Sequence, residues 1–112
     1  IKKLPLYFDS SKIESSLLHG DLWAGNWGSY MDSPIIFDPA VYFGDRETDL
    51  AMTMLFGGFG KNFYEAYESC WPLRQGYQKR LKIYQLYHVL NHLNLFGATY
   101  FKSAINLLDE IL

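Results

Sequence analysis

The chain has 112 residues, 49% hydrophobic and 20% charged, a balance that fits one globular domain with a modest core. Ten basic against twelve acidic residues give a net charge of −2, and without a basic run this argues against nucleic-acid binding. The central apolar stretch, residues 50–60, is too short to cross a membrane.

A single cysteine, Cys70, has no partner for an internal disulfide, which favours a reducing, cytoplasmic compartment. We expect its side chain to be half-buried, as a small apolar residue. The chain opens on Ile1 rather than methionine, with no signal peptide after it, and we expect it to be a piece of a longer protein.

The first part of the chain predicts short elements. Residues 1–16 predict a short helix or turn that leads into a connector, and 16–20 predict a short strand. Residues 27–31 and 35–37 then predict the two strands of a hairpin, with its turn at 32–34.

The rest of the chain predicts helices. Asp49 suits the N-cap of a helix that ends at the glycine pair 57–58, and residues 62–71 predict a second helix. The longest helix, 77–96, has so broad an apolar stripe that we expect it to be buried on most sides. A final amphipathic helix covers 100–112. The sequence therefore predicts an α+β fold, mainly helical with a small β-hairpin.

Polar residues gather around the predicted hairpin. His19, Asp21 and Asn26 match the H-x-D-x-x-x-x-N spacing of the protein-kinase catalytic loop, with Gly20 in place of its arginine. Asp38 follows one hairpin later, ahead of a proline. Phosphoryl transfer needs a carboxylate to receive the hydroxyl proton, and oxygen ligands for Mg²⁺, which an amide and a carboxylate supply. On spacing alone, the alternative that these residues cap a turn stays open.

Five stretches carry a more specific pattern: LLHGDLWAGNWG, IIFDPAVYFGDRETDLAM, LFGGF, FYEAYESCWPL and YQLYHVLNHLNLFG. Together they resemble the C-terminal lobe of the fructosamine kinase (ketosamine-3-kinase) family, which is related to aminoglycoside phosphotransferases and, more distantly, to protein kinases. The resemblance implies that residues 1–112 form a protein kinase-like C-terminal lobe, that the hairpin carries the catalytic and metal loops, and that the N-terminal lobe is absent from this chain.

The resemblance also implies roles for individual residues. Asp21 is then the catalytic base, Asn26 and Asp38 are the Mg²⁺ ligands, and His19 and Asp49 support the catalytic loop. The aromatic residues whose flat faces suit a sugar or its amine carrier, with core packing as the alternative for each, are Trp23, Trp27, Tyr42 and Trp71.

The implied reaction transfers phosphate from ATP to the 3-hydroxyl of ketosamines, which are fructosamine or ribulosamine adducts of small amines or of protein lysines. That phosphate is a leaving group on the carbon next to the carbonyl, so elimination detaches the sugar and the kinase serves deglycation. Two alternatives stay open: a kinase for another small alcohol, such as an aminoglycoside or choline, and a truncated, non-catalytic kinase-like module that binds a partner or ligand. Without the N-terminal lobe, we expect the chain alone to be inactive.

Three further patterns leave questions open. GGFGK at 57–61 departs from a Walker A loop, because Leu55 stands at the first glycine position, and we expect a helix stop followed by a loop. His88 and His92 have the spacing of a zinc protease without its glutamate, so we expect two packed histidines that can still line the substrate side. For the charged residues at 45–47, a solvated loop and a functional role are equally open.

Overall fold

A computed structural model describes residues 2–8 and 13–112. The predicted helix or turn near the start is η1 (Leu4–Tyr7), and the connector expected after it includes residues 9–12, which lie outside the described residues. The elements that follow are β1 (Ser15–Leu18), η2 (Ala24–Asn26), β2 (Trp27–Tyr30), β3 (Ser33–Ile36), β4 (Tyr42–Asp45), α1 (Glu47–Leu55), α2 (Lys61–Cys70), α3 (Tyr77–Phe96), η3 (Ala98–Tyr100) and α4 (Phe101–Ile111).

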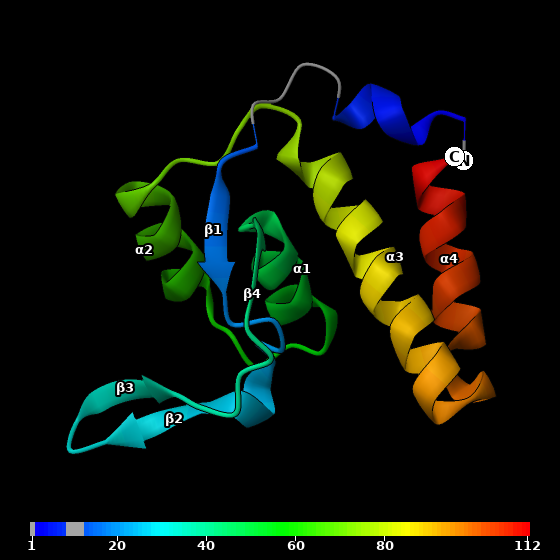
Figure 1. Cartoon of the computed structure of the whole chain (residues 1–112). Coiled ribbons are helices and arrows are strands. Elements are labelled where there is room, and N and C mark those ends of the chain that lie inside the picture. The colour runs from blue at the N-terminus through cyan, green and yellow to red at the C-terminus, as the bar shows by residue number, and fades with distance from the viewer. Residues whose placement is uncertain (1, 9–12) are drawn as a thin grey trace.

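The strands form two separate antiparallel pairs, β1 with β4 and β2 with β3. The β2–β3 hairpin projects from the rest of the molecule (Figure 1). Its turn lies at Met31 and Asp32, whose φ angles of 48° and 60° are those of a type I′ turn. The predicted hairpin is confirmed, and its turn includes Asp32 as predicted. Ser33 and Pro34, also expected in the turn, already belong to β3, where the edge of a sheet tolerates a proline. No strand was predicted at β4.

The helices lie close to their predicted ranges, and α3 matches its range of 77–96. The N-cap prediction for Asp49 was wrong, because α1 begins at Glu47. The carboxylate of Asp45 accepts the Glu47 N–H at 3.0 Å and so satisfies one of the N–H groups that a helix start leaves open. The expected loop after α1 is present, since α2 begins at Lys61.

Two apolar clusters share α3. One lies between α3 and α4, which run antiparallel (Figure 1), and is built from Leu86, Val89, Ala104, Leu107 and Ile111. The other joins α1 to α3 through Leu50, Ala51 and Leu81, with aromatic residues of α2 packed against it. Because both clusters depend on α3, this helix fixes where α1 and α4 lie.

Contrary to prediction, α3 is not buried on most sides. Tyr87 and Leu90 are 59% and 42% exposed, and each follows a buried residue of the α3–α4 contact by one position. In two antiparallel helices, the residue that follows a contact residue points toward the same side of the pair on both helices. We call the resulting surface the α3–α4 apolar face; its exposed members are Tyr87, Leu90, Phe101, Ile105 and Leu112.

Two further observations concern exposure. Cys70 is exposed, so the prediction of a half-buried thiol was wrong. Among the described residues, no helix combines the length and apolar character needed to cross a membrane.

Candidate active site

The loop after β1 holds Asp21 and Asn26 together. The Asn26 side-chain amide donates to the Asp21 carbonyl at 2.9 Å and to its carboxylate at 3.1 Å. Because both partners are acceptors, the amide nitrogen faces Asp21 and the amide oxygen points away from it. Asn26 is buried and Asp21 is half-buried, so the pair lies at the edge of the protein interior.

Asp38 reaches the same place from the end of β3. The Phe37 N–H donates to the Asn26 carbonyl at 3.0 Å, and the Asn26 amide nitrogen lies 3.5 Å from the Asp38 carbonyl. Asp38 has a φ of 53°, a left-handed conformation that aspartate adopts more readily than most residues. Its side chain is exposed, and no described residue donates a hydrogen bond to its carboxylate. The structure therefore brings Asp21, Asn26 and Asp38 together.

His19 ties the two segments to each other. Its Nδ1 accepts the Asp21 N–H at 3.3 Å, so the proton of the neutral ring sits on Nε2, which donates to the Phe37 carbonyl at 2.9 Å. The His19 carbonyl also accepts the Ala40 N–H at 2.8 Å. One buried histidine thus fixes residue 21 relative to the segment that carries Asp38.

Asp49 of α1 binds the backbone at the start of this loop. Its two carboxylate oxygens accept the His19 N–H at 2.8 Å and the Gly20 N–H at 3.0 Å. Gly20 has a φ of 84°, and a Cβ there would lie 1.9 Å from the Ala40 carbonyl oxygen. A side chain at position 20 does not fit, which explains a glycine where protein kinases carry arginine.

Two titratable groups near the loop have pKa values that differ from the ordinary ones. Partial burial, with Tyr87 and Asp49 nearby, raises the pKa of Tyr42, so its hydroxyl stays protonated at neutral pH. Burial lowers the pKa of His88, whose Nε2 donates to the Thr48 carbonyl at 3.0 Å. Both groups are therefore neutral near pH 7.

Comparison with known proteins identifies the family of this chain. The sequence model of the fructosamine kinase family matches residues 1–112. The chain belongs to the fructosamine kinase family. It is 55% identical over 97 residues to the "Probable ketoamine kinase" of Vibrio cholerae, covering 87% of this chain and 34% of that protein. It is 48% identical over 109 residues to the "Ketosamine-3-kinase" of Mus musculus, covering 97% and 35%.

A solved structure agrees with these relatives. A crystal structure assigned as a fructosamine-3-kinase from Haemophilus somnus 129PT superposes with a TM-score of 0.87 and 35% identity, covering 99% of this chain and 39% of that one. The mixture of helices and small antiparallel sheets is therefore the fold of this part of the fructosamine kinase family. The chain spans about a third of the length of the relatives it matches.

The aromatic candidates fall into different surroundings. Trp23 lines a cavity of about 290 Å³ together with Phe56, His92, Phe96 and Tyr100, close to the loop that carries Asp21. Trp27 packs on Phe59 with ring centroids 5.7 Å apart. The sequence pattern indicated Trp23, and it also indicated His92 as able to line the substrate side. The other walls, Phe56 after α1, Phe96 of α3 and Tyr100 of η3, had no local signal beyond their aromatic type.

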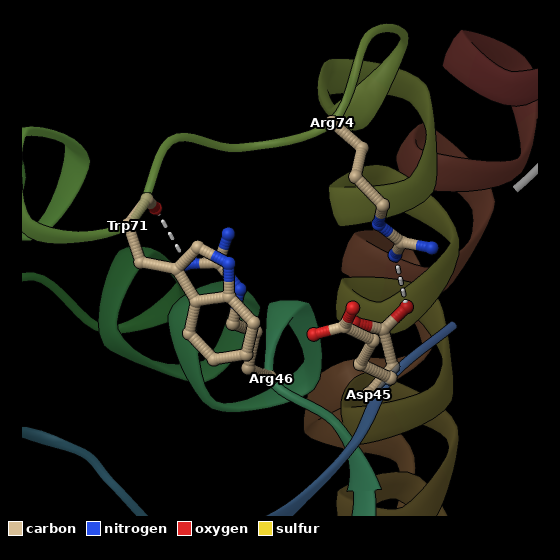
Figure 2. A pocket seen from close by; sticks show the side chains of 5 residues that line it. Asp45, Arg46, Trp71 and Arg74 are labelled. Carbon is tan, nitrogen blue, oxygen red and sulfur yellow. Dashed lines mark hydrogen bonds and ion pairs between the residues drawn. The ribbon is translucent and has the colours of Figure 1, made fainter. Parts of the chain in front are cut away.

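Trp71 packs against Arg46. Its ring stacks 4.0 Å from the guanidinium of Arg46, which also donates to the Trp71 and Pro72 carbonyls at 2.8 and 2.6 Å. Figure 2 shows this contact beside Arg74 and Asp45, with which it lines a small cavity of about 100 Å³. Trp71 also lines a cavity of about 280 Å³ together with Leu22, the residue that follows Asp21.

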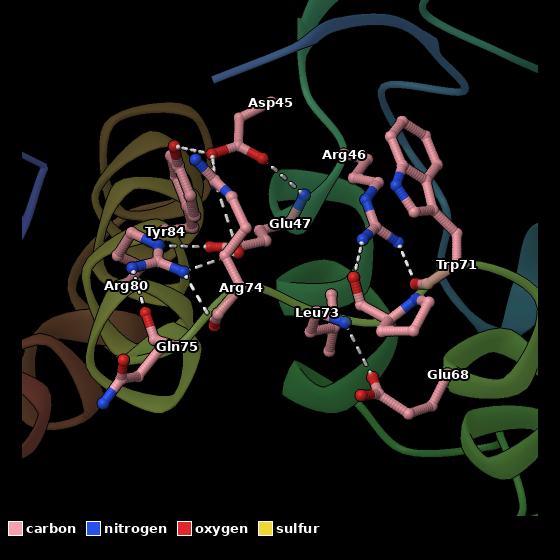
Figure 3. Close-up of polar contacts among 11 residues, drawn as sticks. Asp45, Arg46, Glu47, Glu68, Trp71, Leu73, Arg74, Gln75, Arg80 and Tyr84 are labelled. Atoms are coloured by element: carbon pink, nitrogen blue, oxygen red, sulfur yellow. Dashed lines mark hydrogen bonds and ion pairs between the residues drawn. The ribbon is translucent and has the colours of Figure 1, made fainter. Parts of the chain in front are cut away.

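Residues 45–47 are buried, so the interpretation as a solvated loop was wrong. Arg80 binds Glu47 through two hydrogen bonds of 2.7 and 2.9 Å, and Tyr84 donates to Asp45 at 2.9 Å (Figure 3). Burial and the Asp45 charge raise the pKa of Tyr84, and the Glu47 hydrogen bond raises that of Arg80. We call this group the α1–α3 ion cluster; its members are Asp45, Glu47, Arg74, Arg80 and Tyr84.

Proposed function

We propose that this chain is the catalytic C-terminal lobe, with a protein kinase-like fold, of a longer kinase that phosphorylates the 3-hydroxyl of ketosamines in deglycation. The observation that carries the proposal is the position of Asn26, whose amide nitrogen reaches both Asp21 and the Asp38 segment. Membership of the fructosamine kinase family gives this arrangement its substrate class.

Each polar residue has a task in this reaction. The oxygen of the 3-hydroxyl attacks the γ-phosphorus of ATP, and the carboxylate of Asp21 receives the hydroxyl proton. The bond between the γ-phosphorus and the bridging oxygen of the β-phosphate breaks. The Asn26 amide oxygen and the Asp38 carboxylate are the ligands for Mg²⁺, which offsets the charge of the phosphates when bound. The fit is supported by the amide nitrogen of Asn26 facing Asp21, which leaves the amide oxygen available.

The supporting residues act on Asp21 through the backbone. His19 holds the residue 21 N–H and the residue 37 carbonyl with its two ring nitrogens. Asp49 holds the two N–H groups that precede Asp21. These contacts support a loop that is ordered before substrate arrives, which is what transfer by positioning requires.

The aromatic cavity at Trp23 suits the substrate. Its lining offers ring faces for the apolar face of a sugar and for the cationic amine that carries it. Trp23 follows Asp21 by two positions, so a sugar held there would lie near the proposed base. For Trp27 and Tyr42 we propose the neighbouring wall of the substrate site, and for Trp71 its contacts with Arg46 favour packing over substrate binding.

The α3–α4 apolar face supports the idea that more polypeptide belongs to this protein. Ile105 and Phe101 are 41% and 58% exposed on a helix whose neighbouring stripe is already buried, an arrangement that favours a second packing partner. Relatives about three times as long supply enough chain for that partner. We therefore propose that the remaining part of the same polypeptide covers this face and completes the ATP cleft.

An acceptor screen on the full-length protein tests the function. With Mg·ATP, we expect phosphorylation of fructosamine and ribulosamine adducts, both free and on peptide lysines, and none of aminoglycosides or choline. Turnover of an aminoglycoside alone would replace ketosamines by another alcohol as the substrate. Calorimetry with Mg·ATP on the 112-residue chain distinguishes the proposed catalytic lobe from a non-catalytic binding module. We expect no micromolar binding, because the remaining polypeptide completes the ATP cleft; micromolar binding by this chain alone would show that the nucleotide needs no further lobe.

A further inference from the structure

The first turn of α1 is attached to α3 at two consecutive residues. The Glu47 side chain is bound by Arg80, and the Thr48 carbonyl accepts a hydrogen bond from His88 at 3.0 Å. Arg80 and His88 are eight residues apart on α3, about two turns of helix. α3 therefore holds the start of α1 along a length of its surface rather than at one point.

The next residue of α1 holds the loop with the proposed catalytic base. Asp49 accepts the N–H groups of His19 and Gly20, and Asp21 follows directly. Thus Glu47 and Thr48 contact α3, and the next residue, Asp49, contacts the loop. Any rotation of this turn relative to α3 would be passed to the backbone just before Asp21.

The geometry at Glu47 fixes that rotation. Arg80 donates Nε to one carboxylate oxygen at 2.7 Å and Nη2 to the other at 2.9 Å, and two parallel bonds define a direction as well as a distance. Successive helical residues are about 100° apart, so a slip of one position in α1 would turn Asp49 away from the loop.

Stability alone explains this pair poorly. Glu47 and Arg80 are 1% and 3% exposed, and an apolar pair of similar volume often stabilises a core as well as a buried ion pair does. What an apolar pair does not supply is a fixed direction. Arg74 also reaches Glu47, at 3.1 Å, which adds a second cation to the same carboxylate.

We propose that Glu47 and Arg80 are positioning residues for Asp21: their two-bond contact sets the first turn of α1, through which Asp49 orders the backbone before Asp21. Neither residue touches the substrate in this scheme. The inference rests on the proposed role of Asp21 in phosphoryl transfer, so its test needs one readout that does not depend on turnover.

The activity arm compares two variants of α3 in the full-length kinase. Arg80→Lys keeps the charge and removes the fork, and we expect kcat to fall about 10- to 100-fold with KM for ATP and ketosamine nearly unchanged. The control, Lys82→Gln, removes the exposed ion pair of Lys82 with Glu110 on the same helix and should leave both constants unchanged. A change in KM with kcat preserved would overturn the proposal.

The second arm measures amide hydrogen exchange on the same proteins. In Arg80→Lys we expect the His19 and Gly20 amides to exchange about tenfold faster, while amides of the β2–β3 hairpin keep their rates. Unchanged exchange at His19 and Gly20 would overturn the proposal. This arm reports on the attachment even if the acceptor screen finds no kinase activity, so failure of the two proposals is distinguishable.

The unaltered protein gives a further test if Arg80→Lys does not fold. The proposal requires the loop amides to open together with α1, so native-state exchange should give His19 and Gly20 the same opening free energy as Ala51 and Met52. A lower opening free energy for the loop amides would mean that the loop moves independently of α1, and would overturn the proposal.

Discussion

Carboxylates occur in two regions of this molecule with opposite surroundings. In the α1–α3 ion cluster, Glu47 is 1% exposed and both of its oxygens accept hydrogen bonds from Arg80. At the loop, Asp38 is exposed and no described residue donates to its carboxylate. Carboxylates that stabilise the fold already accept hydrogen bonds from protein donors, whereas those without such donors remain available for a ligand. This difference separates the two kinds more than residue type does.

The largest expected effect sharpens the reactive side of this comparison. Asp21→Asn removes the proposed base but keeps the size of the side chain, so we expect the proposed phosphoryl transfer by the full-length protein to fall at least about 10³-fold. Thermal unfolding measures the fold and should be unchanged. Asp32→Asn, at the exposed hairpin turn, is the matched control and should keep full activity. Substantial turnover by Asp21→Asn would remove Asp21 from its role.

The next effect tests the structural side. Glu47→Ala leaves Arg80 buried without its partner, and we expect the free energy of unfolding to drop by about 3–5 kcal/mol. Glu65→Ala breaks an exposed pair with Lys61 on α2, whose loss should cost at most about 0.5 kcal/mol. Urea unfolding of both variants measures the difference. Equal losses would mean that burial does not distinguish the two carboxylates.

A third pair of variants tests the close packing at the loop. Gly20 and Gly57 both have positive φ, 84° and 72°, but an added Cβ meets the Ala40 carbonyl only at Gly20, with nothing within 4 Å at Gly57. Gly57→Ala should therefore cost about 1 kcal/mol of backbone strain, and Gly20→Ala clearly more. Urea unfolding compares them, and similar costs would show that the backbone at position 40 yields easily.

Local sequence patterns predicted much of the fold but not the ion cluster. The range of α3 and the approach of Asn26 to Asp38 followed from apolar periodicity and from a hairpin between the two residues. Glu47 and Arg80 are 33 residues apart, and no periodicity encodes which of several charges will meet. β4 was missed for the same reason, since its four residues become a strand only by pairing with β1.

Asp49 shows how one residue type satisfies two local patterns. An aspartate before an apolar run suits an N-cap, yet its carboxylate accepts backbone N–H groups from residues 19 and 20 instead. Both uses exploit the same preference of a carboxylate for unpaired backbone donors. Asp49 binds the loop because the pairing of β4 with β1 brings the loop next to α1. This contact depends on tertiary structure.

The smallest expected effect concerns pH. His88 is buried and donates to the Thr48 carbonyl, and burial holds its pKa below the ordinary value of 6.5. Below that pH the unfolded chain takes up a proton more readily than the folded one, so the free energy of unfolding should decline as the pH falls. Urea unfolding between about pH 7 and 5 measures the slope. His88→Gln cannot take up the proton and should have a shallower slope; an identical slope would mean that other groups dominate the acid side.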